Sequence, residues 1–167
     1  MINTIINVVF SYLIGSLSGS LIIGKLRGVD IRELGSGNAG GTNAFRTQGF
    51  IFALGVVLID VLKGFFSAYF VSTLTYGTFI FWGNPELNIL LCGLSAVVGH
   101  VYPIYHGFRG GKGAGAGMGM ILALDPASLG VAISLWVICL ILTGFVGFGT
   151  MIAVSSIPIY LFSTGNN

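Results

Sequence analysis

The residues best suited to chemistry gather in two glycine-rich stretches that also hold most of the positive charge. We call residues 25–46 the first basic island and residues 108–113 the second basic island; together they contain six of the seven Lys and Arg residues. Glycine lets the backbone approach a ligand closely, and successive backbone N–H groups form binding sites for anions. Two such loops predict a protein that binds phosphate groups.

The first basic island contains the pattern G-x-G-x-x-G at residues 35–40. A dinucleotide site would need a strand before this pattern, whereas here an apolar segment of membrane type precedes it. Its glycines and short polar side chains still favour phosphate binding, above all where a helix begins after them. The alternative is a flexible loop that happens to be rich in glycine. The residues expected to contact phosphate are Lys25, Gly35, Gly37, Asn38, Gly40, Gly41, Thr42 and Asn43, with the charge of Arg46 beside them.

The second basic island has the sequence F-R-G-G-K-G. It is not a Walker A loop, because His106 stands where that motif has its first glycine and Gly113 replaces the residue that binds Mg²⁺. Lys112, placed among glycines at the start of a helix, nevertheless suits a phosphate, with Arg109 close by. The alternative is an ordinary basic anchor on the cytoplasmic side of a membrane.

Three further polar residues lie within apolar stretches. Asp60 and Lys63 are three residues apart and so share one face of a helix. Because a charged residue at membrane depth costs about 2.5–3.5 kcal/mol, we expect them to form a structural ion pair beneath the site; contact with a substrate headgroup is the alternative. His100 is also expected to be structural, since it lacks the H-x4-D motif, with four residues between His and Asp, that supplies the general base of soluble-type glycerolipid acyltransferases.

The background around the islands indicates that most of the chain is solvated by lipid. Of the 167 residues, 54% are hydrophobic and 7% are charged, whereas a soluble domain has about 25% charged residues. A spanning helix needs about 20 mainly apolar residues. The candidate segments are residues 3–24, 48–76, 87–102, 113–124, 128–143 and 150–162. The fourth is short enough to be re-entrant, and together they predict an all-α, polytopic membrane bundle that forms a single domain over residues 1–167.

The positions of the charges predict an orientation. Basic residues follow the first apolar segment, so the positive-inside rule places the N-terminus outside and both islands on the cytoplasmic face. The turn at residues 83–86 then lies outside, with Trp82 at the membrane interface. Two compact loops do not form the basic stripe of a nucleic-acid-binding protein. Because Cys92 and Cys139 lack the spacing of a disulfide or metal site, we expect no metal, no cofactor and no nucleic acid.

Several motifs together resemble the bacterial acyl-phosphate:glycerol-3-phosphate acyltransferase family. They lie at residues 15–16, 25–32, 35–43, 60–64, 99–103 and 108–113. The resemblance implies an integral enzyme of the inner membrane that acylates the sn-1 hydroxyl of glycerol 3-phosphate from a fatty acyl phosphate, which a soluble partner enzyme supplies. The products are lysophosphatidic acid and phosphate. Ser36 and Arg46 match important positions of the family's first motif, residues 37–43 match its phosphate loop, and Lys112 matches the basic residue of its second motif.

The chain departs from the family pattern at three places. Gly41 replaces an alanine, and residues 144–150 lack the base and the serine that the family carries after its fifth helix. The family also continues with a seventh helix and a basic tail, which this chain, ending at Asn167, is expected to lack. The competing functions are a transporter or channel for a small phosphorylated anion, and a non-catalytic subunit that docks a soluble enzyme.

The chemistry that the family implies needs no covalent intermediate, because an acyl phosphate is already an activated anhydride. We therefore expect direct transfer, with Arg46 and Lys112 stabilising the charge that develops in the transition state. No side-chain base is evident, so a phosphate oxygen of the substrate is expected to accept the hydroxyl proton.

Overall fold

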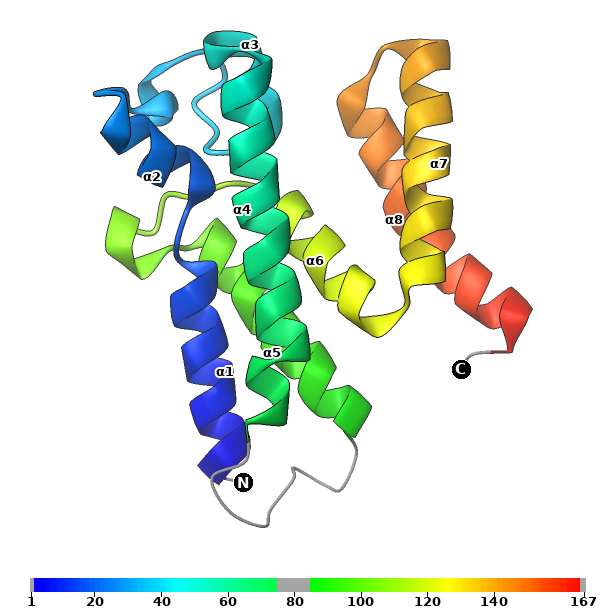
Figure 1. Ribbon diagram of the computed structural model, residues 1–167. Coiled ribbons are helices and arrows are strands. Elements are labelled where there is room, and N and C mark those ends of the chain that lie inside the picture. Colours follow the sequence, from blue (N-terminus) through cyan, green and yellow to red (C-terminus); the bar gives the residue numbers. More distant parts are fainter. Residues whose placement is uncertain (1, 75–84, 166–167) are drawn as a thin grey trace. The chain divides into compact units, whose positions relative to one another are not determined.

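The computed structural model describes residues 2–74 and 85–165, and within these ranges the regular structure is entirely helical (Figure 1). The elements in chain order are α1 (Ile2–Gly15), α2 (Gly19–Leu26), η1 (Ile31–Glu33), α3 (Gly41–Gln48), α4 (Phe50–Tyr69), η2 (Val71–Thr73), α5 (Pro85–Val101), η4 (Ile104–His106), α6 (Ala114–Leu124), α7 (Pro126–Thr143) and α8 (Val146–Thr164). The predicted all-α class is confirmed. Residue contacts divide the chain into two compact units, Met1–Leu124 and Asp125–Asn167.

Each of the predicted apolar segments coincides with a helix or a helix pair. By length and composition, four helices among the described residues could cross a bilayer, and the pair formed by α1 and α2 would make a fifth. That pair is bent by 42° at residues 16–18, a break that the sequence analysis did not predict. α6 is short, as expected. Trp82 and residues 83–84 lie outside the described residues.

Glycines set the spacing of the helices in the first unit. Gly64 of α4 lies against the backbone of Ala116 in α6, and Gly119 of α6 lies against the backbone of α4 at Val61, so a Cβ at either glycine would overlap the neighbouring helix. Gly15 of α1 meets Ala96 of α5 in the same way. Small residues permit such close approach in lipid, where packing replaces the hydrophobic driving force.

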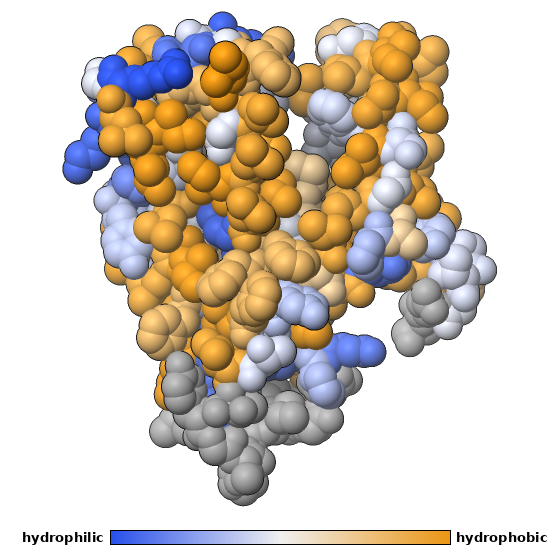
Figure 2. All heavy atoms as spheres, viewed as in Figure 1, coloured by the Kyte–Doolittle hydropathy of each residue, from blue (hydrophilic) through white to orange (hydrophobic). Residues whose placement is uncertain are grey.

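A small apolar core fixes the first basic island to the helices below it. Its buried members come from α2, η1, α3, α4 and the connecting loop, and they are Leu21, Ile31, Ala39, Ala44, Phe52, Ala53 and Val56. Hydrophilic side chains gather over α2 and the loop after it, whereas the flank of α4 is apolar (Figure 2). The exposed leucines of α4, such as Leu58 and Leu62, suit contact with lipid.

The second unit is the pair α7 and α8. Asp125 caps α7, because its carboxylate accepts hydrogen bonds from the backbone N–H groups of Ala127 and Ser128. A hydrogen bond from the Ser128 hydroxyl, more than the two backbone hydrogen bonds, holds the pKa of Asp125 below its ordinary value. Trp136 of α7 donates a hydrogen bond from Nε1 to the hydroxyl of Thr150 in α8 at 3.3 Å.

Candidate functional site

One buried side chain, that of Asn43, shapes the first basic island. Its Nδ2 donates to the backbone carbonyls of Ile31, Leu34 and Asn38 at 3.0–3.1 Å, and its Oδ1 accepts from the backbone N–H of Ser36 at 3.0 Å. All of its polar atoms are therefore used to hold the loop together. Asn43 was predicted to contact phosphate, but the polar atoms of its side chain bind the backbone of the loop instead. A contact with phosphate through its backbone N–H stays a prediction.

The loop that Asn43 holds has two features that favour the binding of an anion. Gly35 and Gly37 have φ angles of 55° and 71°, a left-handed conformation that favours glycine. The loop leads into α3, whose first N–H groups, at Gly41, Thr42 and Asn43, have no acceptor within the helix. Such a helix start attracts negative charge.

The second basic island folds back onto the end of α5. The backbone N–H groups of Gly110 and Gly111 donate to the carbonyls of Val101 and His100 at 3.2 and 3.1 Å. A Cβ at Gly111 would overlap Nε2 of His100 and would lie 3.2 Å from the carbonyl oxygen of Ala39. Because Ala39 belongs to the first basic island, the structure brings the two islands into contact.

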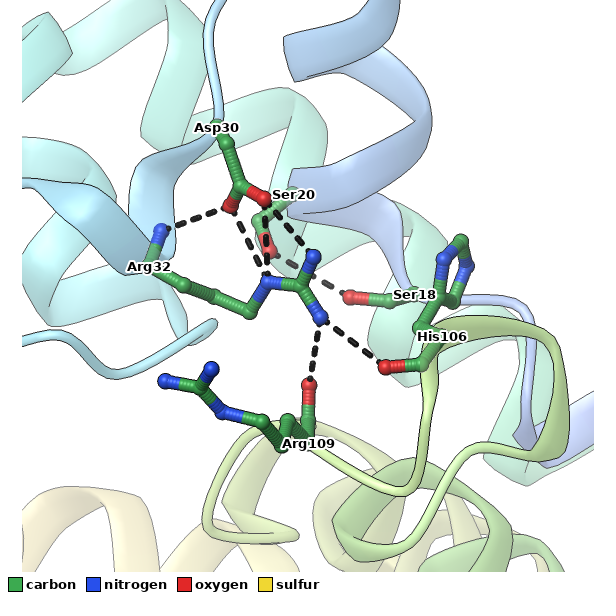
Figure 3. Close-up of polar contacts among 6 residues, drawn as sticks. All are labelled: Ser18, Ser20, Asp30, Arg32, His106 and Arg109. Atoms are coloured by element: carbon green, nitrogen blue, oxygen red, sulfur yellow. Dashed lines mark hydrogen bonds and ion pairs between the residues drawn. The ribbon is translucent and has the colours of Figure 1, made fainter.

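Arg32 makes a second connection between the islands (Figure 3). Its Nη2 lies 2.7 Å from Oδ2 of Asp30, while its Nη1 donates to the carbonyl of His106 at 2.9 Å and to that of Arg109 at 3.4 Å. The hydrogen bond from Arg32 is the main reason why the pKa of Asp30 lies below its ordinary value, and the same hydrogen bond raises the pKa of Arg32. The pair thus stays charged at neutral pH.

The predicted ion pair between Asp60 and Lys63 is present and deeply buried. Nζ of Lys63 lies 2.9 Å from Oδ1 of Asp60, and it also contacts Nδ1 of His100 at 2.8 Å and donates to the carbonyl of Leu17 at 2.7 Å. The backbone N–H of Gly19 donates to Oδ1 of Asp60 at 3.3 Å. The pair therefore stabilises the backbone at the break between α1 and α2, where groups freed from the helix would otherwise be unsatisfied in lipid.

The remaining predicted site residues are mostly accessible to a ligand. Ser36, Thr42, Arg46, Lys25, Arg109 and Lys112 are exposed, and their basic members form no ion pair with any described residue. Their charges are available for an anion. Within residues 2–74 and 85–165, no three His, Cys, Asp or Glu side chains gather as a metal site requires.

Sequence reasoning missed the roles of Asp30, Arg32 and Ser20. Ser20 donates from Oγ to the carbonyl of Ala39 at 2.9 Å and so holds the loop to α2. The spacing Asp-x-Arg at a short helical turn was a usable signal for a cap that also binds the arginine. Nothing in the sequence indicated that the same arginine reaches residues 106 and 109.

Comparisons with known proteins agree in pointing to one activity. A family model described as glycerol-3-phosphate acyltransferase matches residues 5–165. The glycerol-3-phosphate acyltransferase of Chlorobaculum parvum is 42% identical over 166 residues, which cover 93% of this chain and 71% of that protein. The protein of the same name from Desulfotalea psychrophila is 38% identical, with 93% of this chain and 77% of that protein covered.

Two solved structures are also similar. One is PlsY (YgiH), described as an integral membrane glycerol 3-phosphate acyltransferase in its glycerol 3-phosphate form; it aligns with a TM-score of 0.83 at 32% identity and covers 97% of this chain and 78% of its own. The other is its lysophosphatidic acid form, with a TM-score of 0.82 at 31% identity and coverage of 97% and 77%.

Proposed function

This chain belongs to the glycerol-3-phosphate acyltransferase family of multi-pass membrane proteins, and from that premise we propose that it acylates the sn-1 hydroxyl of glycerol 3-phosphate with a fatty acyl phosphate. The products are lysophosphatidic acid and phosphate. The observation that carries the proposal is the contact between two basic, glycine-rich loops, because the two substrates each bear a phosphate group.

In the proposed reaction the hydroxyl oxygen forms an ester bond with the acyl carbon, and the bond from that carbon to the phosphate oxygen breaks. The hydroxyl proton passes to an oxygen of a substrate phosphate. Arg46 and Lys112 stabilise the negative charge that develops, and the first amides of α3 bind one phosphate. Ser36, exposed at the tip of the loop, donates a hydrogen bond to a substrate oxygen. Holding both substrates in place supplies much of the rate.

The acyl tail is proposed to lie in an apolar groove beside α4. The groove has a volume of about 450 Å³ and is lined by Ile14, Leu62, Lys63, Phe65, Phe66 and Phe70. Lys63 contacts His100, and His100 lies against Gly111 of the second basic island. Lys63 and His100 thus link the groove to the second basic island.

We further propose that residues 1–167 act as one domain in a bacterial inner membrane, with the site on the cytoplasmic face. A soluble enzyme that makes acyl phosphate is the expected partner on that side. The exposed bases of both islands support this orientation, since basic loops favour the cytoplasm.

The proposal is tested with the purified protein, acyl phosphate and glycerol 3-phosphate, with lysophosphatidic acid as the measured product. We expect product, and a loss of at least about 100-fold in kcat for Arg46→Ala and Lys112→Ala, because each removes charge stabilisation in the transition state. Arg27→Ala is the control, since its guanidinium lies 5.5 Å from the Phe52 ring centroid and Arg27 has no assigned role in binding phosphate or in the reaction. Wild-type rates in both variants would overturn the assigned roles.

The same preparation separates the competing functions. Flux of a phosphorylated anion into liposomes without product formation would identify a transporter. Product formation would exclude a non-catalytic docking subunit.

A further inference from the structure

We propose that Arg32 is a positioning residue: held by Asp30, its guanidinium binds the backbone carbonyls of His106 and Arg109 and thereby fixes the second basic island against the first. The nitrogens of the guanidinium divide this work. Nε and Nη2 donate to the Asp30 carboxylate at 2.7–3.2 Å, and Nη1 donates to the two carbonyls, 74 and 77 residues away in the chain. Figure 3 shows this guanidinium between the two loops.

The anchor on the first island is rigid. Asp30 caps η1, because its Oδ1 accepts the backbone N–H of Arg32 at 2.9 Å. Between these two residues, Ile31 is fully buried, and its carbonyl accepts a hydrogen bond from Asn43. Arg32 therefore projects from a fixed piece of backbone.

The segment that Arg32 binds is a turn with an unfavourable backbone. Gly107 and Phe108 have φ angles of 64° and 59°, and Phe108 is the only described residue other than glycine with a positive φ. A bulky residue in this conformation is strained and persists only where its surroundings hold it. Arg32 binds the carbonyl before this pair, at His106, and the carbonyl after it, at Arg109.

Charge also favours this role. Both islands carry an excess of basic side chains, and before a phosphate binds these like charges repel each other where the islands meet. The Asp30–Arg32 pair is neutral as a unit, so it joins the islands without adding to that repulsion. The Asp30 carboxylate in addition attracts Arg109, whose charge contributes to the lowered pKa of Asp30.

The effect on turnover rests on the proposed function. Arg109 and Lys112 can act on a phosphate held by the first island only if the two loops keep their spacing. A displacement of about 1 Å can cost up to about 100-fold in rate. Loss of Arg32 is therefore expected to lower kcat more than it raises KM for glycerol 3-phosphate.

The first test measures the backbone directly, without any assay of activity. Hydrogen exchange of residues 104–112 in the purified protein is compared among wild type, Arg32→Lys, Asp30→Asn and the control Glu33→Gln. Lysine carries its three donors on a single nitrogen and has no planar fork, so it cannot make the two-nitrogen contact with the Asp30 carboxylate and reach both carbonyls at the same time. We expect faster exchange of this segment in Arg32→Lys and Asp30→Asn, and wild-type exchange in Glu33→Gln, which removes a neighbouring carboxylate of the same turn. Unchanged exchange in Arg32→Lys would overturn the proposal.

The second test separates positioning from general stability. We expect Arg32→Ala to lose about 10-fold or more in kcat, with KM changed less. Added guanidinium should restore part of kcat, because the Arg32 side chain is 22% exposed and its site can be reached from solvent. Methylammonium at the same ionic strength should not restore it. Equal recovery with both cations, or a loss confined to KM, contradicts a positioning role. If wild type itself forms no product, the proposed function fails while the exchange result still decides the role of Arg32.

Discussion

At the scale of single residues, Asn43 shows how one side chain can specify a whole loop. Its amide binds four backbone groups of the first basic island, so neither a shorter side chain nor a carboxylate can replace it. An amide has donors and an acceptor on one group, whereas a carboxylate only accepts.

We predict that Asn43→Asp destabilises the fold by at least about 3 kcal/mol, because a carboxylate would face three carbonyls and lose every donor. The free energy of unfolding in detergent measures the change. Thr47→Val is the control on the same helix, since it removes only one hydrogen bond, from Oγ1 to the carbonyl of Asn43. Equal stability of Asn43→Asp and wild type would show that the loop is held by other contacts.

The buried pair of Asp60 and Lys63 makes a different residue-scale prediction. Removing one partner leaves an unpaired buried charge, so Lys63→Met should cost about 3–5 kcal/mol. Removing both charges, in the double variant Asp60→Asn with Lys63→Met, should cost less than the sum of the single changes, because no charge is then left unpaired. This coupling is measured from the unfolding in detergent of wild type, the two single variants Asp60→Asn and Lys63→Met, and the double variant. Additive losses of stability would count against a direct pairing.

At the scale of elements, the contact between α4 and α6 depends on glycines. Gly119 lies against the α4 backbone, whereas Gly117, two residues earlier on α6, has open space around its Cβ position. We predict that Gly119→Ala separates the helices and lowers both the unfolding temperature and activity, while Gly117→Ala leaves them unchanged or slightly improved through helix propensity. The paired measurement uses thermal unfolding in detergent, and a Gly119→Ala protein as stable as Gly117→Ala would exclude close packing here.

Helix positions were predictable from sequence because a bilayer demands long apolar segments, and α4 to α8 lie where hydropathy places them. The break at residues 16–18 was not, because glycine and serine also occur within continuous membrane helices and do not by themselves mark a break. What stabilises this break are Asp60 and Lys63, more than forty residues later. Periodicity within one segment carries no information about such partners.

The candidate site, like the fold, was predictable from sequence only in part. Glycine content and basic charge identified both islands, since those properties belong to the residues themselves. The connection through Arg32 was not predicted, because its acceptors are backbone carbonyls, which every residue possesses. The structural role of the Asn43 side chain was not predicted for a related reason: a polar side chain in a loop can bind a ligand or the loop itself, and composition does not distinguish these.

At the scale of the whole molecule, the orientation in the membrane remains a prediction with a direct test. Cysteines introduced at Glu33 and Tyr105, both exposed, should react with a membrane-impermeant maleimide only from the cytoplasmic side, and one at Ala127 only from the other side. The unmodified chain is the control, because Cys92 and Cys139 are buried. Labelling of residues 33 and 105 from opposite sides would show that the islands cannot share a substrate.

The bent first span has a consequence for how the chain is made. As the ribosome delivers α1 and α2 to the translocon, the carbonyl of Leu17 and the amide of Gly19 have no partners, since Asp60 and Lys63 are 41–46 residues away and not yet synthesised. This bent span must therefore stay hydrated at its break until the second span brings Asp60 and Lys63, and only then can it be stably embedded in lipid. The bent span of α1 and α2 and the span formed by α4 therefore integrate into the membrane together.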